Sequence, residues 1–395
     1  MTCLVKAPRF VGAFFCLFFF LPLVSFALDW TPSDIFTQRE KQNLRIRENG
    51  VYRGYLYNES RTVFSVNPDE AGYTGVFFEY EQMTRDARDI ARRIDSSQKG
   101  SLLPGPGGVF SVPPGQEWPF LLNFPAFPEE TPAPGERWRG EGLRILQPVR
   151  DMVPTRVPFL CEFEYAGPGD LNGEPVEVIN AQYAVRYRQG ADPWGDPNLT
   201  QVQGKHLVTI YLNQQSGKIF MRDTVDEVYD FSGGRQLVVS GFILTWYGGG
   251  LPGERKRLTE EIREELERTG TGGVTVEETG IGVSINLEVI HFVPDQAVVL
   301  PEEKGKIDTL AAILRRLEDK TFLVVGHTAD VGTPESQMEL SIQRAKTLAD
   351  ELAARGIPAG RFLYEGRGGT EPVAPNDTEE GRGRNRRVQI FILED

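Results

Sequence analysis

Seven short runs between residues 136 and 247 are rich in strand-forming residues, and in 206–212 the face pattern changes at every residue; this β-rich pattern constrains the fold most strongly. Alternation with a period of two is typical of strands with one buried face. Turn-forming sequences at 213–217 and 230–234 separate neighbouring runs. The pattern therefore predicts an antiparallel meander, folded as a sandwich, an open barrel or a half-barrel wrapped on a helix. The expected strands are 142–146, 159–165, 176–187, 204–212, 218–223, 227–231 and 237–246.

The preceding region, residues 28–135, is less regular. Alternation at 60–66 and 75–80 predicts two strands, and 82–94 reads as a short polar helix. Between residues 100 and 134 proline and glycine are dense, which excludes a helix or a central strand. We expect an extended loop here, held by Trp118, Phe120 and Phe127.

Residues 1–27 have the pattern of a targeting segment. Lys6 and Arg9 precede an uncharged, Phe-rich run, and small residues follow at Ser25 and Ala27. This order predicts a signal peptide that is cleaved after Ala27, and hence an exported protein. The alternative is a retained transmembrane anchor, because the run is long enough to span a bilayer.

Composition argues against several classes of function. The net charge of −13 over 395 residues argues against nucleic-acid binding, because phosphate binding needs a basic face. The three histidines, at 206, 291 and 327, have no second ligand at metal-binding spacing, and Cys161, the single cysteine after residue 27, lies in an apolar run typical of a buried thiol. No P-loop or Gly-x-Ser-x-Gly motif occurs. We therefore expect no catalysis, no cofactor and no metal.

The C-terminal region has a different pattern. Residues 248–273 comprise a glycine-rich linker and a charged helix at 254–268. In the segment 274–395, apolar residues at helical spacing predict helices at 302–317 and 335–354, with strands at 274–278, 282–287, 321–325, 362–366 and 387–393. This order predicts an α+β domain, with one mixed sheet and helices on one face. The chain is thus expected to be multidomain, with a β-rich antiparallel N-terminal module.

A turn with the sequence Gly-His-Thr-Ala-Asp-Val-Gly, at 326–332, follows one of these strands. Loops at the carboxyl end of a strand are common positions for binding residues. Asp330 lies in the turn, and Arg344 follows in the next helix within Leu-Ser-Ile-Gln-Arg at 340–344. A carboxylate suits an ammonium group and a guanidinium suits a carboxylate, so the pair could recognise a zwitterion.

These two motifs, together with Asn-Arg-Arg-Val at 385–388, resemble the OmpA-like (OmpA/Pal/MotB C-terminal) domain over residues 274–393. The resemblance implies non-covalent binding of peptidoglycan through the diamino acid of its stem peptide. It assigns the carboxylate-binding arginine to Arg344. The family's aspartate falls at Ala329, and Asp330 stands one place later. Either the turn presents Asp330, or the pocket has lost or changed its ammonium partner.

The same resemblance implies further contact residues. They are Thr328 in the turn, Leu340 in the helix, Phe292 and Pro294 in the loop after the first strands, and Arg387 in the closing motif. Alternatives remain for some residues: His327 is expected to be structural, Arg387 could form a surface salt bridge, and Asp330 could cap the turn.

The resulting hypothesis is a periplasmic or outer-membrane-associated envelope protein of a diderm bacterium, which tethers its N-terminal β-rich module to the cell wall. Peptidoglycan is the expected ligand, and outer-membrane or periplasmic proteins are possible partners of the β-rich module. One alternative is an outer-membrane β-barrel with a periplasmic wall-anchoring domain. Two others are an envelope enzyme that acts through the β-rich module and a motor-stator-like protein with a retained anchor.

Overall fold

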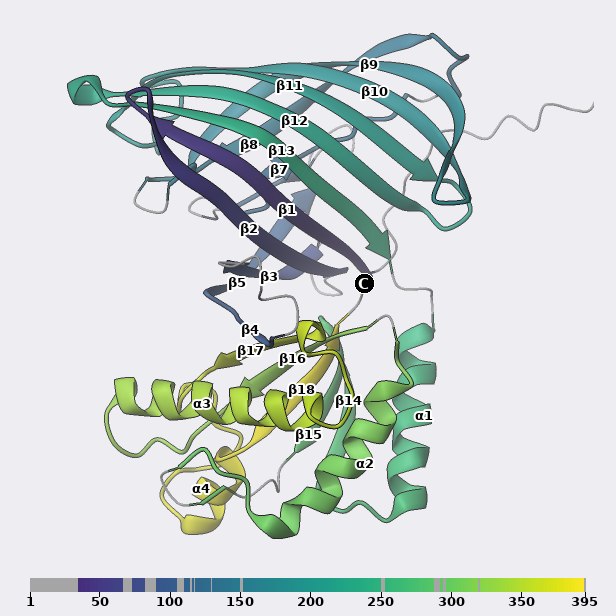
Figure 1. Cartoon of the computed structure of the whole chain (residues 1–395), viewed down its shortest axis with the longest axis vertical. Helices are drawn as coiled ribbons and strands as arrows, with labels where there is room; N and C mark the ends of the chain where they lie inside the picture. Colours follow the sequence, from purple (N-terminus) through teal and green to yellow (C-terminus); the bar gives the residue numbers. More distant parts are fainter. Residues whose placement is uncertain are drawn as a thin grey trace, which may run out of the picture.

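The computed structural model describes residues 35–66, 73–81, 90–104, 110–113, 116, 118–128, 130–149, 152–249, 253–287, 292–293, 296–318 and 320–393. These residues form two β-sheets, one above the other in Figure 1, with helices packed on the lower sheet. The expected signal peptide and Pro294 lie outside the described residues.

The upper sheet has twelve strands in the order β6-β5-β3-β2-β1-β13-β12-β11-β10-β9-β8-β7. Because β1 pairs with β13, strands from the expected regions 28–135 and 136–247 share one sheet. All its strand pairs are antiparallel, so the predicted β-rich antiparallel module is confirmed. The strands are β1 (Ile35–Glu48), β2 (Val51–Val66), β3 (Tyr73–Glu81), β5 (Ser96–Pro104), β6 (Phe110–Ser111), β7 (Leu121–Leu122), β8 (Arg137–Leu146), β9 (Thr155–Leu171), β10 (Glu174–Arg188), β11 (Leu199–Asn213), β12 (Lys218–Phe231) and β13 (Gln236–Gly249).

Two hairpins of this sheet turn through an Asn-Gly pair. At Asn49 and Gly50 the φ angles are +47° and +79°, and at Asn172 and Gly173 they are +56° and +88°. Two consecutive positive φ angles define the tight hairpin turn whose twist matches that of the flanking strands. These pairs fix the registers of β1 with β2 and of β9 with β10.

The inward face of the sheet encloses the main hydrophobic core. Along β10 alternate residues are buried, so one face of each strand enters the core and the other faces solvent. The loops between β7 and β9 complete this core with Phe124 and Met152. Figure 1 shows how strongly the sheet curves around its inward face.

A cluster of charged side chains lies within this core. The Nδ1 atom of His206 is 2.8 Å from Asp223 Oδ2, and its Nε2 atom is 3.0 Å from Glu227 Oε1. Arg144 lies within 3.9 Å of both carboxylates. A neutral imidazole has one N–H, so two carboxylates on its two nitrogens favour the doubly protonated ring. Burial and Arg144 lower the pKa of His206, but the bonds to Asp223 and Glu227 outweigh them and raise it above 6.5.

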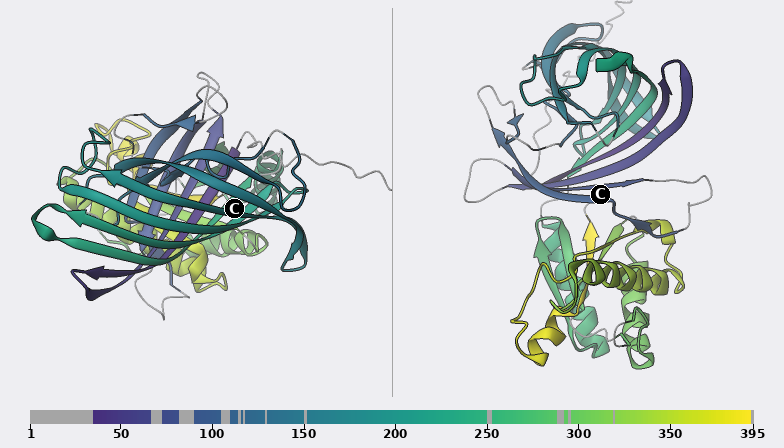
Figure 2. Two further views of the ribbon diagram at one scale, coloured as in Figure 1. Left: turned by 90° about the horizontal axis from the view of Figure 1, so that it is seen from above. Right: turned by 90° about the vertical axis from the view of Figure 1, so that its left-hand side faces the viewer.

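The C-terminal domain is a mixed sheet with helices on one face, so the predicted α+β class is confirmed (Figures 1 and 2). Its strand order is β14-β15-β18-β16-β17-β4, in which β16 and β17 are parallel. Its elements are α1 (Glu254–Thr269), β14 (Val274–Thr279), β15 (Gly282–Leu287), α2 (Lys304–Arg315), β16 (Thr321–Gly326), α3 (Pro334–Ala353), β17 (Phe362–Gly366), α4 (Glu379–Asn385) and β18 (Val388–Leu393).

The sixth strand of this sheet comes from the N-terminal half of the chain. β4 (Arg92–Arg93) pairs in parallel with β17. Next to it, Ile94 packs against Leu323 and Leu363, on the face of the sheet opposite the helices. The polar helix predicted at 82–94 is therefore wrong for its last residues, and residues 82–89 lie outside the described part.

A buried carboxylate joins the two domains. The side chain of Glu59 on β2 is fully buried and lies 2.7 Å from Arg39, 3.3 Å from Lys41 and 3.0 Å from Arg92. Arg92 also donates to the carbonyl oxygen of Gly360 in the C-terminal domain. The N-terminal sheet is thus attached to the C-terminal sheet by an apolar contact, a shared strand pair and an ionic cluster.

Among the helices that the structure describes, none combines the length and apolar character needed to cross a membrane.

Candidate functional site

The turn between β16 and α3 is held tightly against the following helix. A Cβ atom on Gly326 would lie 2.1 Å from the carbonyl oxygen of Ser341, so glycine is required for this close approach. At the other end, Thr333 caps α3 by accepting a hydrogen bond from the Ser336 N–H at 3.2 Å. The turn that carries Thr328 and Asp330 therefore has a fixed position on the sheet edge.

Arg344 lies on the buried side of α3, with 5% of its surface exposed. Its Nε donates to the carbonyl oxygen of Gln296 at 3.2 Å, and its guanidinium lies over the ring of Phe292, 5.1 Å from the centroid. Phe292 is positioned by a β-bridge to Val299. The structure thus brings together Phe292 and Arg344, which were both predicted to belong to the site. Pro294, which was predicted to line the pocket, lies outside the described residues.

Asp330 is exposed at the N-terminal end of the same helix. Its Oδ1 atom accepts a hydrogen bond from Gln337 Nε2 at 3.0 Å, and its N–H donates to Asn376 Oδ1 at 3.2 Å. Gln337 and Arg344 are two turns apart on α3, about 10 Å along its axis. Because helical side chains lean toward the N-terminus, Arg344 leans toward the end of α3 at which Asp330 lies.

Three buried residues, His327, Thr328 and Ala329, separate Asp330 from β16. Ala329, which the sequence resemblance aligns with the family's aspartate, is 5% exposed. Thr328 is also buried, and its N–H donates to the carbonyl oxygen of Gly368 at 2.8 Å. The Thr328 hydroxyl has no hydrogen-bond partner within the described residues. A buried hydroxyl without a partner is unusual and marks a place where a ligand or water could bind.

His327 and Arg387 belong to the framework of the site. The His327 N–H donates to the carbonyl oxygen of Arg387 at 2.9 Å, and its Nε2 lies 2.7 Å from Gln389 Oε1. Burial, and then the charge of Arg387, lowers the pKa of His327 to about 4, so the ring is neutral at pH 7. Arg387 is itself buried and donates to the carbonyl oxygen of Glu371 at 3.1 Å.

The loop that supports Asp330 depends on Asn385, which the sequence analysis noted only as part of a motif. Asn385 is fully buried and accepts hydrogen bonds from the Val373 and Ala374 N–H groups. Its Nδ2 donates to Asn376 Oδ1 at 2.9 Å, the same atom that receives the Asp330 N–H. The closing motif therefore acts on the turn through Asn376.

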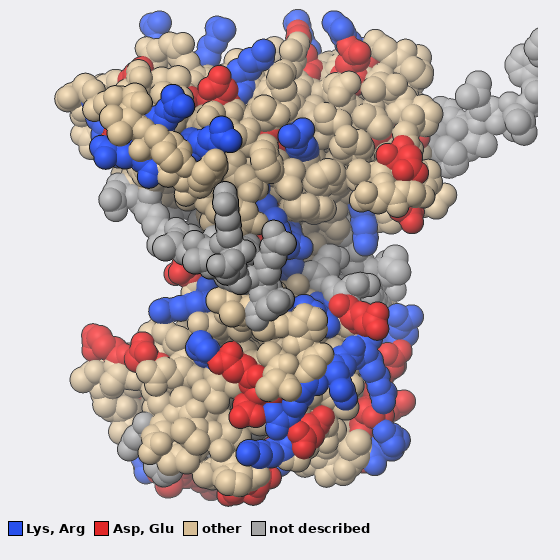
Figure 3. All heavy atoms as spheres, in the orientation of Figure 1, with Lys and Arg blue, Asp and Glu red and all other residues tan. Residues whose placement is uncertain are grey.

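Leu340, the remaining predicted contact, is half-buried on α3. Gln296 and Gly368 were not predicted, because both contribute a backbone carbonyl oxygen that has no side-chain signature. On the face shown in Figure 3, basic and acidic side chains are interspersed over the C-terminal domain. No field of one sign therefore extends over that face of the domain.

The described residues contain no group of three or more His, Cys, Asp or Glu side chains that could hold a metal ion. Cys161 lies in the core of the N-terminal sheet, where burial raises the pKa of its thiol to about 12. A thiol with such a pKa is a poor nucleophile at neutral pH.

Comparison with known proteins finds similarity to one family. The model of the OmpA family matches residues 291–386. "Outer membrane protein A" of Bordetella avium is 38% identical over 99 residues, which cover 25% of this chain and 51% of that protein. "Probable lipoprotein YiaD" of Escherichia coli is 30% identical over 160 residues, which cover 40% of this chain and 72% of that protein. "Peptidoglycan-binding protein ArfA" of Mycobacterium tuberculosis is 36% identical over 103 residues, which cover 26% of this chain and 32% of that protein. The chain thus spans about half the length of the Bordetella protein.

Proposed function

We propose that this chain, which belongs to the OmpA family, binds peptidoglycan through its C-terminal domain and tethers its N-terminal sheet to the cell wall. The names of its relatives support an envelope protein, and one of them is named for peptidoglycan binding. The proposed activity is reversible binding without catalysis. The proposal includes export through a signal peptide cleaved after Ala27 and a location in the periplasm, in association with the outer membrane.

The observation that carries this proposal is the setting of Arg344. It is a buried guanidinium that stacks on Phe292 and is oriented by the Gln296 carbonyl. A guanidinium fixed in this way presents a planar set of donors that matches a carboxylate. We assign it to a carboxylate of the peptidoglycan stem peptide.

Asp330 is the proposed partner of the ligand's ammonium group. It is exposed, and Gln337 holds one of its oxygens. In this assignment the space between the two charges is lined by Thr328, Leu340 and Phe292. Arg387 supports the turn, because its carbonyl oxygen accepts the hydrogen bond from the His327 N–H.

Tethering follows from the way the domains are joined. Glu59, Arg92 and Ile94 attach the N-terminal sheet to the C-terminal sheet. A wall-bound C-terminal domain would therefore hold the N-terminal sheet at a fixed distance and orientation. Envelope proteins that bind this sheet would be kept near the wall.

Co-sedimentation of the full chain with purified peptidoglycan tests the proposal. Arg344→Lys keeps the positive charge and removes the planar fork, and we expect binding to weaken at least tenfold. Lys346→Ala is the matched control, because Lys346 lies two residues away on α3 and is half exposed. Failure of the unaltered chain to sediment, or equal binding by the two variants, would refute the proposal.

A further inference from the structure

A row of aromatic and basic side chains crosses the face of the N-terminal sheet that lies opposite its core, and the row ends at Arg61, which is buried and donates a hydrogen bond to Thr321 of the C-terminal domain. Strand register places Tyr211, Phe220, Trp246, Arg39 and Arg61 directly opposite one another on five adjacent strands. Directly opposed residues share one face of a sheet, so the row is continuous. The ring centroids are 5.8 Å apart for the first pair and 5.3 Å for the second, and the guanidinium of Arg39 lies 5.5 Å from the Trp246 centroid.

A β-bulge bends the β9–β10 hairpin over this row. The register of the hairpin shifts between Val178 and Ile179. The extra residue is Ala166 on β9, because Tyr165 is paired with Ile179 and Gly167 with Val178. Beyond the bulge the facing of β9 is reversed, which brings Leu171, at the hairpin tip, to the outward face, where it lines a pocket together with Val176 and Tyr211. Bulges redirect side chains in this way and often lie beside binding sites.

The pocket has a volume of about 520 Å³. This falls within the range of about 300–1,000 Å³ that is typical of small-molecule sites. The aromatic row forms its floor, and its charged lining is mainly basic. Three of the four charged side chains are cationic, namely Arg39, Arg61 and Lys218, and the fourth is Glu174.

The basic side of the pocket adjoins the ionic cluster between the domains. Arg39 is ion-paired with Glu59, which Lys41 and Arg92 also contact. Burial lowers the pKa of Lys41, and although the charge of Glu59 opposes this shift, the charges of Arg39 and Arg92 add to it. Several cations close together in a partly buried setting favour a ligand that carries negative charge.

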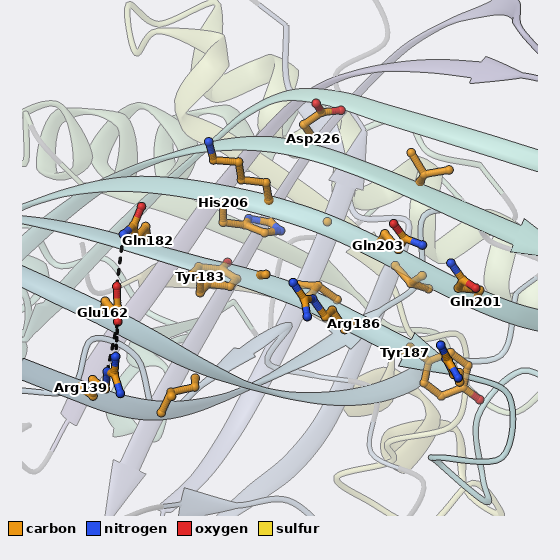
Figure 4. Close-up of a pocket in the computed structure, with 18 residues that line it drawn as sticks. Arg139, Glu162, Gln182, Tyr183, Arg186, Tyr187, Gln201, Gln203, His206 and Asp226 are labelled. Atoms are coloured by element: carbon orange, nitrogen blue, oxygen red, sulfur yellow. Dashed lines mark hydrogen bonds and ion pairs between the residues drawn. The ribbon is translucent and has the colours of Figure 1, made fainter.

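A larger hollow on the same sheet has a different character. It measures about 1110 Å³ and lies along the open face of β8 to β12 (Figure 4). Its lining includes Arg139, Glu162 and Gln182, which Figure 4 shows joined to one another. These contacts are typical of a solvated strand face.

Aromatic cross-strand pairs such as those of the Tyr211–Phe220–Trp246 row also stabilise sheets on their own, but such stabilisation does not require a hairpin to bend over them.

We propose that the pocket between the β9–β10 hairpin and the Tyr211–Phe220–Trp246 row binds a single-chain anionic amphiphile, such as a fatty acid. The hydrocarbon chain lies on the aromatic floor, and the acidic headgroup lies at the rim beside Lys218. An apolar floor favours a hydrocarbon over a sugar, because sugar hydroxyls need more hydrogen-bond partners than such a floor provides.

Equilibrium binding of the full chain to decanoate, dodecanoate and tetradecanoate tests the proposal, with each fatty acid below its micelle concentration. We expect binding to tighten about fourfold with each added methylene, or ~0.8 kcal/mol, until the pocket is full. Phe220→Ala should weaken binding of all three fatty acids. Lys218→Glu should weaken the binding of the three fatty acids about tenfold. It should leave the affinity for methyl dodecanoate, which has no charge, unchanged.

Lys205→Glu is the matched control, because Lys205 is an exposed lysine on the same side of the sheet but outside this pocket. It should bind dodecanoate like the unaltered chain, and circular dichroism will show whether each variant is folded. Three results would overturn the proposal: no saturable binding, equal losses in Lys218→Glu and Lys205→Glu, or binding of an amino-sugar disaccharide in place of the fatty acids. This outcome is independent of peptidoglycan co-sedimentation, since Arg344 does not line the pocket.

Discussion

The guanidinium of Arg344 lies over the ring of Phe292, with 5.1 Å between its central carbon and the ring centroid. Stacking uses the face of a guanidinium, whereas carboxylates bind along its edge, so one arginine can make both contacts. Phe292 lies in the loop before α2, and Arg344 lies in the middle of α3. The carboxylate site is thus formed by two elements that meet only in the folded domain.

Thr328→Val separates a binding role from a structural one. The Thr328 hydroxyl is buried without a partner in the described residues, so its removal should leave the free energy of unfolding within about 0.5 kcal/mol of the original. If the hydroxyl contacts the ligand, peptidoglycan binding should weaken several-fold. Urea unfolding and co-sedimentation measure the two effects. A loss of stability without a loss of binding would assign Thr328 to the framework.

Asp330→Asn tests the shifted acidic residue. A charged hydrogen bond to the ligand's ammonium group contributes ~1.5–3 kcal/mol, so binding should weaken about tenfold or more. Asp350→Asn is the control, because Asp350 is a half-exposed acid on α3, the helix that follows the turn. If both variants bind peptidoglycan equally well, Asp330 only caps the turn.

The buried cluster around His206 predicts a pH optimum of stability for the N-terminal sheet. The pKa of His206 is raised above 6.5 in the folded state, so its contribution is complete below pH 6.5 and is lost as the pH rises through the folded value. Burial opposes ionisation of Glu227, but Arg144 and His206 outweigh it and hold its pKa at about 2. Its contribution is present above pH 4.5 and is lost as the pH falls toward 2.

The free energy of unfolding should therefore be greatest between about pH 4.5 and 6.5. All five tryptophans lie before residue 250, so their fluorescence during urea unfolding reports on this part of the chain. His206→Gln should lower stability by about 3–5 kcal/mol and remove the decline above pH 6.5. An unchanged alkaline decline in that variant would show that another group titrates there.

Glu59→Gln tests the ionic contact between the domains. Arg39, Lys41 and Arg92 share this fully buried carboxylate, and its removal should lower the free energy of unfolding by about 3–5 kcal/mol. The control is Glu164→Gln, which removes an exposed ion pair with Arg137 and should cost at most about 1 kcal/mol. Equal losses in the two variants would mean that Glu59 does not hold the domains together.

Local patterns predicted those elements whose side chains alternate or repeat cleanly. The helix expected at 335–354 is α3, Pro334–Ala353, because its apolar residues recur at helical spacing. β1 was not predicted. Its outward face carries Arg39, Lys41 and Arg45, and charged residues are poor indicators of strands. Arg39 and Lys41 both contact Glu59, and Arg39 also lines the pocket. Contacts in the folded protein, rather than a local sequence pattern, therefore explain why these residues lie on the strand.

The site was predictable only in part, for a related reason. Arg344 and the turn lie within short contiguous motifs, which a sequence displays directly. The strand pairing of Arg92 with Leu363 joins residues far apart in the chain and has no local periodicity. The Gln296 carbonyl that orients Arg344 belongs to the backbone. Neither contact could be read from residue types.

The most direct test of the central claim is a calorimetric titration of the full chain with a soluble stem peptide that ends in diaminopimelate. The peptide is compared with the same peptide in which the side-chain carboxylate is amidated. If Arg344 holds this carboxylate, the free acid should bind at least tenfold more tightly, and Arg344→Lys should remove the difference. Equal affinity of the unaltered chain for the two peptides would contradict the account.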